Sequence, residues 1–133
     1  MKRVVIILIA NILGFAMGTC AFRLANAEPG PVMFVADLNQ PAIEVPAAFA
    51  AEAGSIVQCE SRWRADAVSP TGDYGLFQLN RRWQEKRANA MGYEWDQMFD
   101  PTINTLVAVA IWESWGQTFR AWSCKPTQEG GTS

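Results

Sequence analysis

Carboxylates are the side chains of this sequence whose types and positions suit them to chemistry. The 133 residues contain no histidine, which excludes Ser-His-Asp and Cys-His arrangements and the zinc sites that use histidine ligands. Glu60 follows a run of apolar residues with helical spacing, and Asp73 lies in the turn-rich segment that comes next. A carboxylic acid can break a glycosidic bond by giving its proton to the leaving oxygen. Any catalysis would therefore have to rest on carboxylates, of which Glu60 and Asp73 are two candidates.

Two short motifs contain these carboxylates. The first is Cys59-Glu60-Ser61, and the second is Gly72-Asp73-Tyr74-Gly75-Leu76-Phe77-Gln78-Leu79-Asn80. In this order they resemble the lysozyme-like superfamily, in particular the soluble lytic transglycosylase (SLT) domain family, over roughly residues 53–124. The resemblance implies a lysozyme-like fold. It also implies cleavage of the β-1,4 bond between N-acetylmuramic acid and N-acetylglucosamine, with Glu60 as the general acid.

The resemblance implies roles for neighbouring residues as well. Gln78 matches the glutamine of the family motif and would hold an N-acetyl sugar together with the backbone near Leu76 and Phe77. Ser61 is either a hydrogen-bond partner of the acid or the cap of a helix end. Asn104 resembles an asparagine of the helix that follows in the family. The candidate substrate-binding residues are Ser61, Tyr74, Leu76, Phe77, Gln78, Trp83 and Asn104.

Asp73 decides which reaction the acid would support. The segment from Asp73 to Asn80 is also similar to animal-type lysozymes, in which the aspartate is the second catalytic carboxylate. If Asp73 faces Glu60 across a groove, hydrolysis with retention becomes possible. If Asp73 is a turn residue, groups of the substrate complete a non-hydrolytic, anhydro-forming reaction. We favour the single-acid interpretation, because the segment between the carboxylates is shorter than in animal lysozymes.

The N-terminus has the layout of a secretory signal peptide. Lys2 and Arg3 precede an apolar stretch over residues 4–18, and Ala25-Asn26-Ala27 offers a cleavage site. The apolar stretch is shorter than the roughly 20 residues that span a membrane. We expect cleavage after Ala27 and a secreted or periplasmic protein, with membrane contact only through this segment where it is retained.

Two cysteines are expected to form a disulfide. Removal of the signal peptide would take Cys20 with it and leave Cys59 and Cys124 as an even pair in an exported chain. This favours a disulfide over two buried thiols. By the entropy of loop closure, such a bond would stabilise the fold by roughly 4 kcal/mol. It would also fix the helix end that presents Glu60.

The charge of the chain argues against nucleic acid as a partner. Removal of residues 1–27 takes away three of the eleven basic residues and none of the thirteen acidic ones, which changes the formal net charge from −2 to −5. Phosphate backbones require a basic surface. We expect a monomer that binds peptidoglycan glycan strands in a groove, through stacking and hydrogen bonds, without a metal or organic cofactor.

Helices must position these residues. Apolar side chains at spacings of three and four predict an amphipathic helix over residues 47–63, with Glu60 near its C-terminal end. Asn80 is suited to cap a second helix, and Asp100-Pro101 to start a third. The sequence thus predicts an α+β, mainly α-helical fold. Its predicted parts are a signal peptide (1–27), a proline-rich linker or arm (28–46), a lysozyme-like catalytic domain (47–124) and a flexible tail (125–133).

Tryptophans can either fill the core or stack on sugar rings. Trp112 and Trp115 have helical spacing and are assigned to the core, whereas Trp63 and Trp83 lie beside the motifs and are candidates for the groove. The basic run over residues 81–87 is either a solvated helix face or a contact for carboxylates of the substrate.

Two other functions are consistent with the sequence. A glycan-binding protein of the same fold would have lost turnover, although the presence of both Glu60 and Gln78 argues against this. The other is activity on chitin or chitosan, which share the β-1,4 linkage.

Overall fold

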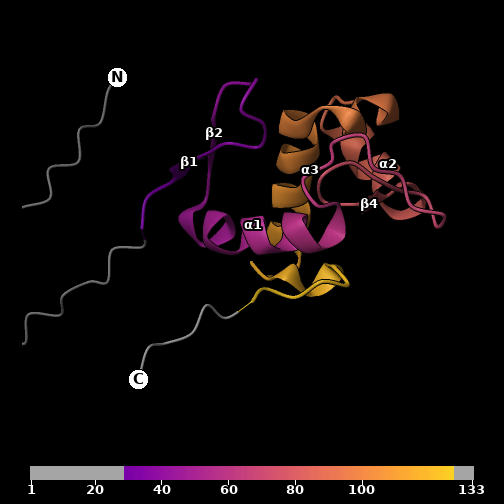
Figure 1. The fold of residues 1–133 in the computed structure, drawn as a ribbon. Helices are drawn as coiled ribbons and strands as arrows, with labels where there is room; N and C mark the ends of the chain where they lie inside the picture. Colours follow the sequence, from indigo (N-terminus) through magenta and orange to yellow (C-terminus); the bar gives the residue numbers. More distant parts are fainter. Residues whose placement is uncertain (1–28, 128–133) are drawn as a thin grey trace, which may run out of the picture.

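The computed structural model describes residues 29–127, which form helices and two small antiparallel sheets (Figure 1). The predicted signal peptide and the last six residues of the predicted tail lie outside this range. Within residues 29–127, none of the helices could span a lipid bilayer. The elements are β1 (Val32–Phe34), β2 (Ile43–Val45), α1 (Ala47–Glu60), β3 (Asp73–Tyr74), β4 (Leu79–Asn80), α2 (Arg81–Ala90), the 3-10 helix η1 (Trp95–Phe99), α3 (Pro101–Ser114) and the 3-10 helix η2 (Phe119–Ala121). The predicted mainly α-helical α+β fold is confirmed.

Helix α1 turns one apolar face to the interior, as its spacing predicts. The helix ends at Glu60, earlier than the predicted end at Trp63. The reason is that Arg62 and Trp63 adopt φ angles of 54° and 62°, which turn the chain away from the helix axis. The helix thus ends on the candidate acid. Its buried residues are Phe49, Ala53, Ile56 and Val57.

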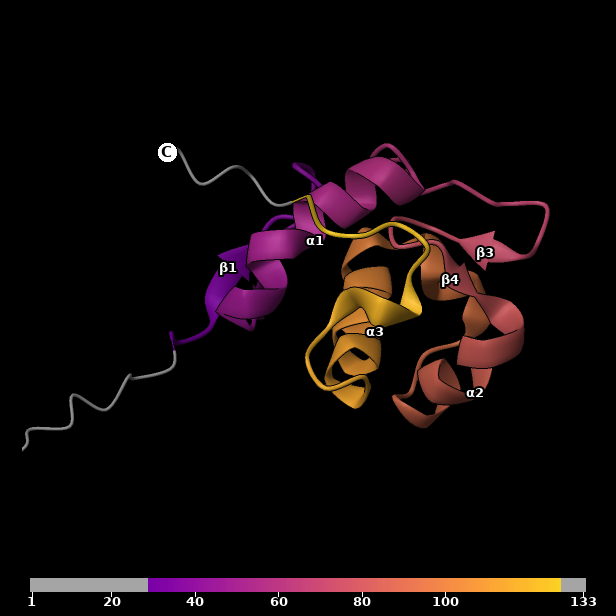
Figure 2. The same cartoon turned by 90° about the horizontal axis from the view of Figure 1, so that it is seen from below.

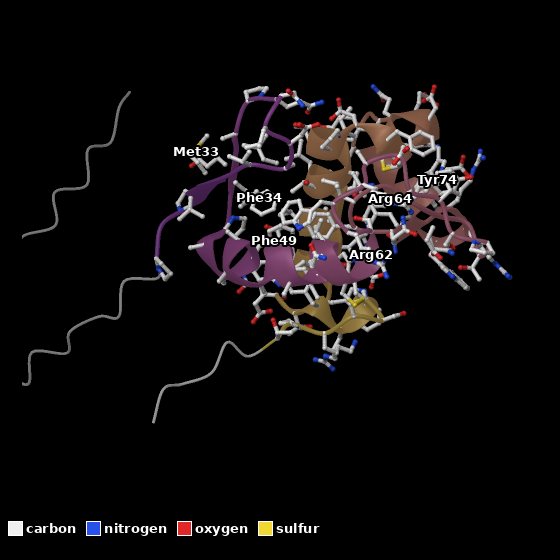
Figure 3. All side chains as sticks on the ribbon, in the orientation of Figure 1. Met33, Phe34, Phe49, Arg62, Arg64 and Tyr74 are labelled. Atoms are coloured by element: carbon white, nitrogen blue, oxygen red, sulfur yellow. A yellow bond between two sulfur atoms is a disulfide. The ribbon has the colours of Figure 1, made fainter. Side chains whose placement is uncertain are left out.

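The segment before α1 is a packed hairpin. β1 and β2 pair in antiparallel fashion, with Phe34 opposite Ile43. Phe34 and Val45 are buried in the core, where the ring centroid of Phe34 lies 6.3 Å from that of Phe49 (Figure 3). The prolines of this segment all lie outside the two strands, so they remove no hydrogen bond from the ladder. The prediction of a linker or loose arm is therefore wrong for residues 32–45.

Helices α2 and α3 begin where predicted but are capped differently. The Oδ1 atom of Asp100 accepts a hydrogen bond from the N–H of Ile103 at 3.0 Å, and Pro101 takes the first position of α3. Asn80 precedes α2, but its side chain does not cap the helix. Its Nδ2 atom instead donates to Oδ1 of Asp73 at 2.7 Å, which ties β4 to β3.

Aromatic side chains join the helices to the second motif. The ring centroid of Phe49 lies 5.6 Å from that of Phe77, 5.7 Å from that of Trp112 and 5.3 Å from that of Phe119. Residues of α1, the motif, α3 and η2 therefore meet at one place. Figure 2, seen from below, shows the C-terminal segment, in yellow, crossing in front of α3 and returning toward α1.

Candidate active site

Four of the predicted site residues line one cavity of about 440 Å³. These are Glu60, Asp73, Gln78 and Trp83. The other walls come from β4, α2, α3 and the C-terminal segment, so the cavity joins parts of the chain that are far apart in sequence. We call this cavity the groove. Its remaining lining residues are Leu79, Asn80, Gln84, Ile111, Trp115, Arg120, Ala121, Trp122 and Ser123.

Glu60 is the last residue of α1, and its side chain is half-buried. Its Oε1 atom accepts a hydrogen bond from the backbone N–H of Cys124 at 3.0 Å, whereas Oε2 accepts none from the residues that the structure describes. Cys124 is bonded to Cys59, with the two Cα atoms 6.0 Å apart, so the predicted disulfide is confirmed. The C-terminal segment thus fixes one oxygen of the carboxyl group and leaves the other available for proton transfer.

Asp73 lines the same groove, but a turn binds both of its oxygens. Oδ2 accepts hydrogen bonds from the hydroxyls of Ser69 and Thr71, and Oδ1 accepts the one from Asn80. Burial acts to raise the pKa of Asp73, but these three hydrogen bonds outweigh burial and hold the pKa below its ordinary value of 3.8. Asp73 is therefore an anion at neutral pH that belongs both to the groove and to the turn.

Gln78 reaches the groove from an unusual backbone conformation. Its φ is 47°, in the left-handed region that residues other than glycine rarely adopt. Its Nε2 atom donates to the carbonyls of Ala67 at 3.1 Å and Gly75 at 2.9 Å. The amide nitrogen therefore holds the loop together, and only Oε1 remains to accept a hydrogen bond from a ligand.

Leu76, Phe77 and Asn104 lie in the core and do not line the groove. The N–H of Phe77 donates to Oδ1 of Asn104 at 2.9 Å, and its carbonyl accepts from Nε1 of Trp122 at 2.8 Å. Both backbone hydrogen-bonding groups of Phe77 are thus engaged within the protein. The Nδ2 atom of Asn104 donates to two further carbonyls, those of Tyr74 and Met98. We call this set of residues the buried junction: Tyr74, Gly75, Phe77, Met98, Asn104 and Trp122.

Ser61 and Tyr74 also face away from the groove. Ser61 is buried, and its hydroxyl donates to the carbonyl of Val57 at 3.2 Å, so of its two expected roles the structure places it in that of a helix-end cap. The ring of Tyr74 packs between Trp95 and Phe99, with both centroid distances at 5.6 Å. Neither side chain is among those that line the groove.

The tryptophans divide differently from the prediction. Trp112 is buried as predicted, but Trp115 is half exposed and lines the groove. Trp115 follows the last turn of α3, where helical spacing no longer determines the direction of a side chain. Trp83 lines the groove with 69% of its surface exposed. Trp63 instead lines a separate cavity beside the loop between β1 and β2.

Sequence reasoning missed the groove residues Trp115, Arg120 and Trp122. The one signal for the last two was their proximity to Cys124, because the predicted disulfide brings that part of the chain to Glu60. Within residues 29–127, no group of three or more cysteine, aspartate or glutamate side chains is placed to hold a metal ion.

A half-buried glutamate at a helix end, on the wall of an aromatic groove in a mainly helical α+β domain, defines a lysozyme-like domain. A model of the Transglycosylase SLT domain family matches residues 39–125, which is well over half of the chain. The chain belongs to that family. Membership implies transglycosylase-type activity on peptidoglycan, a polymer outside the cytoplasm. No curated protein and no solved structure matches the chain.

Proposed function

We propose that this chain is an exported lytic transglycosylase that cleaves the β-1,4 bond between N-acetylmuramic acid and N-acetylglucosamine. The observation that carries the proposal is the position of Glu60 on the wall of the groove. The N–H of Cys124 fixes one of its carboxylate oxygens, and the other oxygen has no hydrogen-bond donor among the described residues. Such a group is suited to give and take a proton at one place.

The proposed reaction needs a single protein carboxyl group. Glu60 gives its proton to the leaving oxygen of N-acetylglucosamine while the bond from that oxygen to the anomeric carbon of N-acetylmuramic acid breaks. A hydroxyl of the same muramyl residue then adds to the anomeric carbon and returns its proton to the Glu60 carboxylate. No water is consumed, and one product has an anhydro end.

A lysozyme-type hydrolase that uses both Glu60 and Asp73 is the second candidate. It is favoured by the presence of both carboxylates in one groove. Against it, three hydrogen bonds bind the oxygens of Asp73 in the turn and stabilise its charge there, which weakens it as a nucleophile. Mass spectrometry of digested peptidoglycan separates the two reactions, because anhydro ends are lighter than reducing ends by one water.

The proposed catalytic domain includes the hairpin at residues 32–45 in addition to residues 47–124. Buried Phe34 and Val45 support this extension. The disulfide and the extracellular polymer on which the family acts support export by the signal peptide at residues 1–27. We further propose a monomer that binds glycan strands without a cofactor.

The decisive experiment replaces Glu60 by Gln. This variant keeps an oxygen for the N–H of Cys124, so we expect unchanged folding but release of wall fragments lower by about 10³-fold. Glu52→Gln is the matched control, because Glu52 lies in the same helix and outside the groove. Retained activity in Glu60→Gln would overturn the proposal. A wild-type protein that sediments with wall and releases nothing would instead indicate a glycan-binding protein.

A further inference from the structure

The groove contains one cationic side chain that the proposed reaction does not use. Arg120, in η2, is exposed and lines the groove together with Glu60 and Asp73. It pairs with neither carboxylate, since the salt bridge found among residues 29–127 joins Arg81 to Glu85. An arginine without an acidic partner offers a planar set of donors that matches a carboxylate of a ligand.

The basic residues of α2 do not line the groove, and its three arginines contact other parts of the protein. Arg81 pairs with an acidic neighbour at 2.8 Å, and Arg82 lies 5.0 Å from the ring centroid of Trp83. Arg87 donates to a backbone carbonyl and a serine hydroxyl of α3. These contacts favour a helix face, and not a substrate contact, for the basic run over residues 81–87. The anion-binding capacity inside the groove therefore comes from Arg120.

The segment that carries Arg120 is anchored on both sides. Phe119 and Trp122 are buried, and Nε1 of Trp122 donates to the carbonyl of Phe77 at 2.8 Å. Two residues further on, Cys124 is bonded to Cys59. An exposed side chain on so well anchored a turn is presented at a defined place on the groove wall, as ligand recognition requires.

We propose that Arg120 determines substrate specificity by binding carboxylates on the substituents of the glycan strand. The enzyme would then prefer strands whose muramyl residues carry anionic peptides over neutral strands such as chitin. Without Arg120, the anionic carboxylate of Asp73 would repel an anionic strand from the groove. This inference rests on the proposed function, because it assigns the substrate preference of the same groove.

The test compares two soluble substrates that differ only in charge. One is a peptidoglycan oligomer with free carboxyl groups on its peptides, and the other is the same oligomer with those groups converted to neutral amides. We expect Arg120→Gln to lower kcat/KM on the anionic oligomer by about tenfold, because a charge-assisted hydrogen bond is lost, and to leave the amidated oligomer unchanged. Arg120→Lys should recover part of the loss, since it keeps the charge without the planar fork.

Arg64→Gln is the control for the charge change itself. Arg64 is exposed and lies outside the groove, on the loop after α1 (Figure 3), so both substrates should be cleaved as by the wild type. Equal losses on both oligomers in Arg120→Gln, or no loss on either, would overturn the inference.

A binding series in the Glu60→Gln background measures the same preference without turnover. Each oligomer is titrated into the protein, and binding is followed by the fluorescence of the groove tryptophans. Adding Arg120→Gln should weaken binding of the anionic oligomer by about tenfold and should not change binding of the amidated one. If the wild-type protein cleaves neither oligomer, the proposed function fails. The binding series then still tests the role of Arg120, because a loss confined to the anionic oligomer supports it and equal losses, or none, contradict it.

Discussion

The groove and the buried junction share one short segment of chain, but they use its residues for different purposes. Asp73 and Gln78, near the two ends of the segment, line the groove. Gly75 and Phe77, between them, contact Asn104 in the interior. The motif that makes the family recognisable thus both lines the groove and packs this segment against α3. Most of the groove wall comes from α2, α3 and the C-terminal segment.

Gly75 shows how closely the buried junction is packed. Its φ is 72°, and a Cβ atom there would lie 2.3 Å from the carbonyl oxygen of Met98 and 2.4 Å from Nδ2 of Asn104. These two atoms are joined to each other by a hydrogen bond of 2.9 Å. A side chain at this position would therefore have to separate the segment from α3.

The largest effect on stability is expected for Gly75→Ala. The left-handed backbone and the clash with Asn104 together should lower the free energy of unfolding by about 3 kcal/mol. Gly72→Ala is the matched control, because Gly72 has a φ of 83° and a Cβ atom added there would have no neighbour within 4 Å. It should lose only about 1 kcal/mol in urea unfolding. Equal losses in the two variants would show that the junction is not tightly packed.

Local patterns in the sequence predicted the scaffold well. The buried face of α1 follows from apolar spacing, the start of α3 from Asp100-Pro101, and the disulfide from an even pair of cysteines. Each of these signals lies within a few residues or depends on a simple count. The hairpin before α1 was missed because its strands have only three residues each, too few for a visible alternation between prolines.

The sequence of the motif alone could not predict which of its side chains point into the core and which point into the groove. Phe77 and Asn104 are 27 residues apart, and only the packing of α3 brings their N–H and Oδ1 atoms together. A resemblance marks such residues as typical of the family without saying whether they touch substrate or core. Trp115 and Arg120 were missed for a related reason. Their directions depend on how α3 ends and on the path of the chain toward Cys124.

A smaller effect is expected for Asp73→Asn, which tests a residue that lines the groove and is held by hydrogen bonds in the turn. Since the pKa of Asp73 in the folded protein lies below 3.8, its anion stabilises the fold at neutral pH. This contribution is lost as the pH falls from about 3.8 through the lower folded value. The variant should lose about 1 kcal/mol at neutral pH, and its difference from the wild type should shrink in acid.

Urea unfolding of both proteins over a pH series measures this difference. If the difference in the free energy of unfolding between the two proteins stays constant as the pH falls below 3.8, the assigned hydrogen bonds of Asp73 are contradicted. The single-acid proposal also requires that Asp73→Asn lose far less activity than Glu60→Gln, with anhydro ends among its products. Loss of activity equal to that of Glu60→Gln would favour the hydrolase.

The smallest effect on stability, and one confined to the groove, is expected for Trp83→Ala. With 69% of its surface exposed, Trp83 contributes little to the core, so the free energy of unfolding should change by no more than about 0.5 kcal/mol. Its ring lines the groove, where loss of a stacking surface should raise KM about two- to tenfold. Trp63→Ala is the control, because it removes an exposed tryptophan from a different cavity. If Trp63→Ala raised KM as much as Trp83→Ala did, sugar binding would extend beyond the groove, and the separation between a buried scaffold and a single open binding surface would fail.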